Sequence, residues 1–182
     1  MIGPLLAALV AAAAPPEGFV VREHRSFYDV AGSDLESVRR RMRALQLHGP
    51  NDDPSSGMTT QQMEVSYELE HVAEGCRMRD LVATVDIEIV LPRLTTRAGG
   101  ELRKSWARML AGLTAHEEGH RENILAAGRE LYDALLALPP GDCKALQRDA
   151  RHVKERVLLK LQIRDQRYDE RTKHGVTQGS VL

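Results

Sequence analysis

Apolar residues recur at helical spacing through most of the C-terminal half of the chain. Between residues 101 and 138 they fall three or four positions apart, and Pro139-Pro140 ends the pattern. A second such stretch covers residues 142–168, and a shorter one at residues 34–47 carries arginines on its opposite face. The pattern predicts three helices, followed by a polar, turn-like tail after Tyr168. The long stretch is defined by Trp106, Met109, Leu110, Leu113, Ile124, Leu131 and Leu135.

The first half of the chain instead shows patterns typical of strands. Residues 19–30 read as extended chain, and apolar and polar residues alternate through residues 63–69. A third run, at residues 81–91, alternates in its second half and is closed by Pro92. We therefore predict an antiparallel sheet with one face in water and the other covered by helices, which is an α+β fold.

Composition narrows the classes of protein that fit. The chain has 182 residues, of which 42% are hydrophobic and 28% charged, as expected for one soluble domain. A net charge of −1 gives no reason to expect a nucleic acid or an anionic membrane as partner. Aromatic residues make up only 4%, which disfavours surfaces that stack on bases. The composition does not indicate an oligomeric state.

The N-terminus suggests export. Residues 1–14 carry no charged side chain and are too few for a transmembrane helix, but they suit the apolar part of a secretory signal. We predict a leader at residues 1–16 and a single domain at residues 17–182, periplasmic or extracellular, without a membrane span once the leader is removed. The alternative is a disordered, alanine-rich N-terminus.

The cysteine content agrees with export. Only Cys76 and Cys143 are present, so one disulfide is possible, and the alternative is two unrelated buried thiols. No C-x-x-C pair exists, which argues against a zinc site built from cysteines.

The segment His116-Glu117-Glu118-Gly119-His120 is an instance of H-E-x-x-H within the long predicted helix. Histidines four residues apart lie one above the other on a helix, so both imidazoles can reach one Zn²⁺ ion, with Glu117 beside them as a general base. The alternative is that both histidines are hydrogen-bonded core residues or are simply exposed to solvent. A long helix with this motif, packed with a second C-terminal helix on a sheet, predicts a zincin-like arrangement.

A catalytic zinc needs a third protein ligand, with its fourth position left for water. Position 126 is Ala126, which excludes the metzincin arrangement. Glu130 would lie about 15 Å along the same helix from His120. Glu155, on the next helix, is feasible but weaker. His174 is the preferred candidate because the tail can fold back toward the long helix, and Asp169 is the runner-up.

The other site residues have expected roles in peptide hydrolysis. Zinc would activate a water and polarise the scissile carbonyl, Glu117 would take the water proton, and Tyr168 would stabilise the developing oxyanion. Glu118 is expected to face solvent or to orient a histidine.

With these residues in view, the chain resembles the bacterial family called domain of unknown function 922, whose members are predicted to be secreted zinc-dependent proteases. The resemblance implies an α+β fold, a zinc ion and a location outside the cytoplasm, and it implies no known substrate. It covers nearly all of the chain after the leader. The segments that carry it are residues 28–32, Gly49-Pro50, Leu91-Pro92, Trp106, the HEEGH motif, the Cys143 region and Tyr168-Asp169-x-x-Thr172-x-His174-Gly175.

The predicted function is that of a secreted zinc metallopeptidase acting on an unidentified peptide or protein. One alternative is a non-catalytic periplasmic zinc-binding or assembly protein, although such a protein would not need Glu117. Another is a zinc hydrolase of cell-wall peptide amides, which the sequence does not distinguish from the first.

Overall fold

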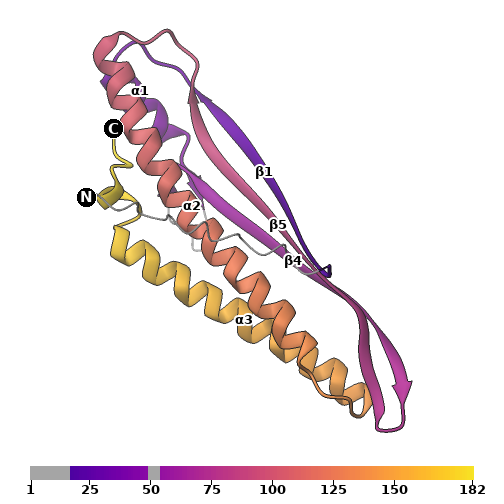
Figure 1. Ribbon diagram of the computed structural model, residues 1–182. Coiled ribbons are helices and arrows are strands. Elements are labelled where there is room, and N and C mark those ends of the chain that lie inside the picture. Colours follow the sequence, from indigo (N-terminus) through magenta and orange to yellow (C-terminus); the bar gives the residue numbers. More distant parts are fainter. Residues whose placement is uncertain (1–16, 49–53) are drawn as a thin grey trace, which may run out of the picture.

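A computed structural model describes residues 17–48 and 54–182 of the chain (Figure 1). The predicted leader at residues 1–16 lies outside these ranges. Within them the chain has an α+β fold with a mixed sheet and three helices, so the predicted fold class is confirmed at this level. In the described part of the chain, no helix combines the length and the apolar character that a membrane crossing requires.

The elements follow the sequence patterns closely. The main sheet contains β1 (Phe19–Val30), β4 (Met58–Val72) and β5 (Gly75–Leu94). The helices are α1 (Leu35–Ala44), α2 (Gly100–Leu136) and α3 (Cys143–Thr172). The short elements are β2 (Leu47–His48), β3 (Pro54–Ser55) and the 3-10 helix η1 (Val176–Gln178). Asp34 caps α1 and Asp142 caps α3, each by accepting a backbone N–H of the first turn.

The direction of β1 differs from the prediction. β5 lies at the centre of the sheet, with β4 antiparallel on one side and β1 parallel on the other, so the prediction of an antiparallel sheet was wrong for β1. β1 ends opposite Leu94 and β4 begins opposite Val90, so the chain leaves β1 and enters β4 at the same end of the sheet. Alternation of apolar residues specifies which face of a strand is buried and carries no information about its direction.

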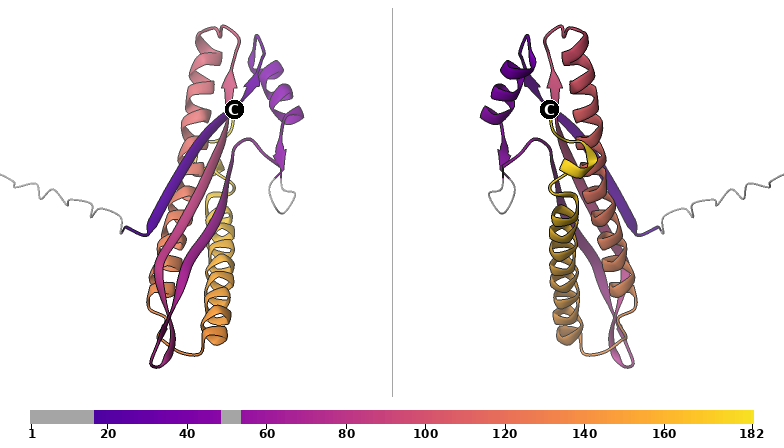
Figure 2. Two further views of the ribbon diagram at one scale, coloured as in Figure 1. Left: turned by 90° about the vertical axis from the view of Figure 1, so that its right-hand side faces the viewer. Right: turned by 90° about the vertical axis from the view of Figure 1, so that its left-hand side faces the viewer.

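Helix α2 lies along one face of the sheet, and α3 packs against α2 (Figures 1 and 2). The two layers approach closely at Gly128, where a Cβ atom would lie only 2.5 Å from a methyl group of Val85. Because α2 contacts the sheet, α3 and η1, it can present side chains to all of them. The inward residues of β5, all buried as the alternation predicts, are Leu81, Ala83, Val85, Ile87, Ile89 and Leu91.

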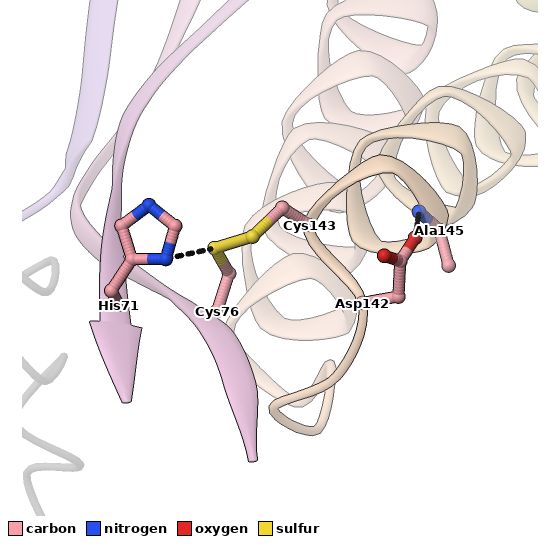
Figure 3. Close-up of a disulfide and its surroundings, with 5 residues drawn as sticks. All are labelled: His71, Cys76, Asp142, Cys143 and Ala145. Carbon is pink, nitrogen blue, oxygen red and sulfur yellow. Dashed lines mark hydrogen bonds between the residues drawn. A yellow bond between two sulfur atoms is a disulfide. The ribbon is translucent and has the colours of Figure 1, made fainter. Parts of the chain in front are cut away.

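A disulfide joins the tip of the β4–β5 hairpin to the start of α3 (Figure 3). Cys76 and Cys143 are bonded, and the Cys76 backbone also exchanges hydrogen bonds with Gly141 at 2.7 and 2.9 Å. The single disulfide that the cysteine content allows is therefore confirmed. It holds the end of the hairpin against the connection between α2 and α3.

Removing this disulfide should destabilise the fold. The bond closes a loop with a sequence separation of 67 residues, and on the chain-entropy model its loss in a Cys76→Ser/Cys143→Ser variant lowers the free energy of unfolding by about 4 kcal/mol. Urea unfolding without reductant measures the loss, and wild-type protein with reductant provides the matched comparison. Equal unfolding midpoints for the variant and the oxidised wild type would contradict the prediction.

Candidate metal centre

The H-E-x-x-H segment lies in the middle of α2, where the helix is covered on two sides. His116 and Glu117 are buried, with 5% and 2% of their surfaces exposed. The two histidines contact α3, whereas Glu117, about 100° further around the helix, contacts β4. The segment therefore lies where α2 passes between the sheet and α3.

Helix α3 brings two carboxylates to this segment. It continues to Thr172, four residues beyond the predicted end at residue 168. The extra turn adds Asp169 and Thr172 to the helix, and they share one face with Asp165 because the three residues are spaced by four and three. This face of α3 meets His116 and His120.

Three potential ligand atoms converge at this contact. The Nε2 atoms of His116 and His120 are 3.3 Å apart, and Oδ1 of Asp169 lies 3.2 Å from the first and 3.0 Å from the second. The side chains of His120 and Asp169 are 14% and 26% exposed, so the cluster is partly accessible. Two imidazole nitrogens and one carboxylate oxygen form a ligand set found in catalytic zinc sites.

The other nitrogen of each imidazole is held by a separate partner. Nδ1 of His116 lies 3.1 Å from Oε1 of Gln178, in η1, and Nδ1 of His120 lies 3.1 Å from Oδ1 of Asp165. Asn123 also donates to that Asp165 oxygen, at 2.9 Å. When Nδ1–H donates outward in this way, the lone pair of Nε2 is left facing the cluster, which is the arrangement that metal-binding histidines adopt.

The spacing of the three atoms fits a zinc ion. Ligands about 2.0–2.1 Å from a tetrahedral zinc lie roughly 3.3 Å from one another. The observed separations of 3.0–3.3 Å match that value without rearrangement of the side chains. The residues present therefore fit a tetrahedral ion with three protein ligands and one open position.

Glu117 is held against the sheet beside this cluster. Its Oε2 accepts a hydrogen bond from the Thr59 hydroxyl at 2.8 Å. A Cβ atom on Gly57 would lie 2.8 Å from its Oε1, so the chain passes close to the carboxylate at a residue without a side chain. Burial raises the pKa of Glu117, while the hydrogen bond from Thr59 and the two imidazoles act in the opposite direction.

Tyr168 packs against both histidines. Its ring is stacked on that of His116, with centroids 5.1 Å apart, and meets the ring of His120 edge-on at the same distance. Gln178 donates to its hydroxyl at 3.0 Å. The ring occupies space that only a glycine leaves free, since a Cβ on Gly119 would lie 2.1 Å from the hydroxyl oxygen. The proposed oxyanion role of Tyr168 stays a prediction, and its contacts position the imidazoles.

The structure places the remaining candidates away from the three converging atoms. His174 follows the end of α3 with a positive φ of 51°; its side chain is 69% exposed, and its Nδ1 is 3.9 Å from Asp169 Oδ1. It is therefore a neighbour of Asp169 outside the close cluster, and its role as a ligand stays a prediction. Glu118 forms an ion pair with Arg25 of β1, and Glu130 forms one with Lys160.

Sequence reasoning missed several partners in this region. Thr59, Gln178 and Asp165 contact site residues but belong to no recognisable motif. The one local signal was the pair Asp165 and Asp169, four residues apart, which would have been recognised had the helix been extended past residue 168.

The carboxylates govern the charge of His120 when no metal is bound. Burial disfavours the imidazolium, but hydrogen bonds to Asp165 and Asp169 outweigh it and raise the His120 pKa from its ordinary 6.5 to about 10. Burial likewise opposes ionisation of Asp169, but its hydrogen bonds with His116 and His120 hold its pKa well below the usual range. In metal-free protein these groups form a partly buried ion pair.

This ion pair predicts a pH dependence of the metal-free fold. Because the folded-state pKa of His120 is raised, its contribution to stability is complete below about pH 6.5 and is lost as the pH rises toward 10. Urea unfolding of chelator-treated protein should therefore show a falling midpoint between these values, and His120→Gln should remove most of the decline. A wild-type midpoint that stays constant over this range would contradict the assignment.

Comparison with known protein families gives a match that covers both sides of the candidate site. The profile of a family described as bacterial protein of unknown function (DUF922) matches residues 25–175, which is most of the chain and includes α2 and α3. The comparison with curated proteins gave no match, and neither did the comparison with solved structures.

Proposed function

The chain belongs to the bacterial family of unknown function DUF922, and we propose that it is a secreted zinc metallopeptidase of the H-E-x-x-H type. The observation that carries this proposal is the convergence of His116 Nε2, His120 Nε2 and Asp169 Oδ1 at 3.0–3.3 Å from one another. We propose these three residues as the zinc ligands, with Asp169 in the place that the sequence alone favours for His174.

The donor set supports zinc as the metal. Imidazole and carboxylate ligands in tetrahedral spacing suit zinc, whereas magnesium and calcium prefer six or more oxygen ligands. The outward hydrogen bonds to Gln178 and Asp165 support the proposal because they fix the tautomer and orientation of both imidazoles.

The residues around the cluster suit peptide hydrolysis. A bound zinc would supply Lewis acidity for a water and for the scissile carbonyl. Glu117 would accept the water proton and return it to the leaving amine, and its raised pKa brings it closer to neutral pH, where a general base works best. The Thr59 hydroxyl would hold one carboxylate oxygen and leave Oε1 for the proton.

Secretion is the second part of the proposal. The disulfide between Cys76 and Cys143 supports an oxidising compartment, because such bonds rarely persist in the cytosol. The apolar residues 1–14 agree with it as a sequence signal.

Removing the metal from the protein with a chelator and then adding zinc back tests the proposed activity. Chelator-treated protein should hydrolyse neither casein nor cell-wall peptides, and zinc should restore hydrolysis in proportion to occupancy, saturating at about one ion per chain. Product analysis by mass spectrometry would identify which peptide bond is cleaved. A zinc-saturated chain that hydrolyses neither substrate would instead favour the non-catalytic alternative, a zinc-binding or assembly protein.

A further inference from the structure

Four cationic side chains line one cleft between α2 and α3. The cleft has a volume of about 560 Å³, and its cations are Lys160, Arg164, Arg167 and Arg171. They recur at spacings of four, three and four residues, so they share one face of α3. Asp169 lies two residues from both Arg167 and Arg171, which turns it to the opposite side of the helix. The cleft is therefore distinct from the side of α3 that meets the candidate metal centre.

The charges in this cleft are not balanced by the protein. Its only lining carboxylate is Glu130, which lies 2.6 Å from Lys160 and 3.7 Å from Arg164. Arg171 lies over the ring of Tyr168, 5.5 Å from its centroid. Among the described residues, Arg167 has no ion-pair partner and is exposed. Two guanidinium groups thus remain available for an anion, and guanidinium binds carboxylates with paired hydrogen bonds.

The outer face of the sheet has a hollow whose lining, unlike that of the α2–α3 cleft, carries charges of both signs. A hollow of about 400 Å³ there is lined by Arg22 and His24 but also by Glu23, Asp86 and Glu88. Arg22 is paired with Asp86 at 3.7 Å. Both signs of charge line that hollow, whereas the lining of the α2–α3 cleft has four cations and one carboxylate.

The shape and lining of the α2–α3 cleft favour a polypeptide as the anion. From Lys160 to Arg171 the helix rises about 17 Å, a length that an extended peptide of about five residues covers. Ile163, which is 41% exposed, and Tyr168 supply apolar surface between the cations. We propose that this cleft binds an acidic polypeptide segment in extended form.

The cleft lies close to the candidate metal centre. Tyr168 lines the cleft, and its ring also stacks on that of His116. A bound segment would therefore lie directly behind the candidate metal centre. The cleft would be a docking site separate from that centre. This proposal goes beyond the proposed hydrolysis and does not depend on it, because binding is measurable on the full chain without turnover.

Fluorescence anisotropy with a labelled hexaglutamate peptide tests the proposal. Wild type should bind it saturably, more weakly as salt increases, and should not bind hexaglutamine. The Arg167→Gln/Arg171→Gln variant should lose roughly tenfold in affinity or more, since it removes both available guanidinium groups. The matched control is Arg148→Gln/Arg151→Gln, which removes two exposed arginines elsewhere on α3 and should change affinity less than about twofold.

Several results would overturn the proposal. Equal losses in the cleft and control variants would show that net charge, and not this cleft, governs binding. Failure of wild type to bind hexaglutamate saturably would exclude the site. Binding of phosphatidylglycerol vesicles that is lost in the cleft variant, while peptide binding is unchanged, would assign the cleft to a membrane surface. If the double variant does not fold, the single variant Arg167→Gln, at an exposed residue without an ion pair, replaces it in the binding measurement.

Discussion

An Asp169→Ala variant is expected to purify without zinc, whereas His174→Ala should retain about one ion per chain. The reason is geometric: Oδ1 of Asp169 completes the three-atom cluster with His116 and His120, at 3.0–3.2 Å. Two imidazoles alone leave the ion without the third protein ligand that catalytic zinc sites use. The side chain of His174 is 69% exposed, and its Nδ1 lies 3.9 Å from the carboxylate of Asp169.

Metal analysis after dialysis, followed by competition titration with a chelator, measures this difference. Asp165→Ala is an informative control because it removes only the outer partner of His120. It should weaken zinc binding by about 10–100-fold without abolishing it. Zinc lost in His174→Ala but retained in Asp169→Ala would reverse the assignment and restore the prediction made from sequence.

The Glu117→Gln variant is expected to keep its zinc and to lose hydrolysis by about 10²–10⁴-fold. Glutamine has nearly the same shape as glutamate, so Thr59 can still hold the side chain in place. It cannot accept the proton of a water, which is the proposed role of Glu117. The loss should therefore appear in kcat and leave metal content unchanged.

Glu118→Gln is the matched control for this prediction. Glu118 is the next residue in the same motif, yet it pairs with Arg25 and Arg121 at the side of α2 that faces β1. Its replacement should leave hydrolysis within about twofold, since surface ion pairs contribute little. Comparable losses in Glu117→Gln and Glu118→Gln would mean that charge near the site matters and that no single residue acts as the base.

Much of the secondary structure could be predicted from local patterns. The extended segment predicted at residues 19–30 corresponds to β1 with the same bounds, and the long apolar stripe corresponds to α2 within two residues at each end. Pro139-Pro140 and the Asp142 cap mark the break between α2 and α3. These features are local, since periodicity, capping and helix breaking depend on residues a few positions apart.

The end of α3 and the direction of β1 could not be predicted in the same way. Residues 169–172 are polar and lack an apolar stripe, but in the fold they remain helical because Asp169 and Thr172 contact the histidines of α2. Likewise β1 is parallel to β5 because the connection through α1 returns the chain to the same end of the sheet. Both outcomes depend on contacts between segments far apart in the sequence.

The local sequence requires that His116 and His120 share one face of a helix with Glu117 beside them, because helical spacing places them there. It also determined that a single disulfide was possible. Which residue approaches those histidines from another element depends on the packing of the whole chain, which brings Asp169 there and leaves His174 further out. The physical reason is that a third ligand must come from a separate segment, whose position depends on how α3 packs against α2, and no local pattern encodes that packing.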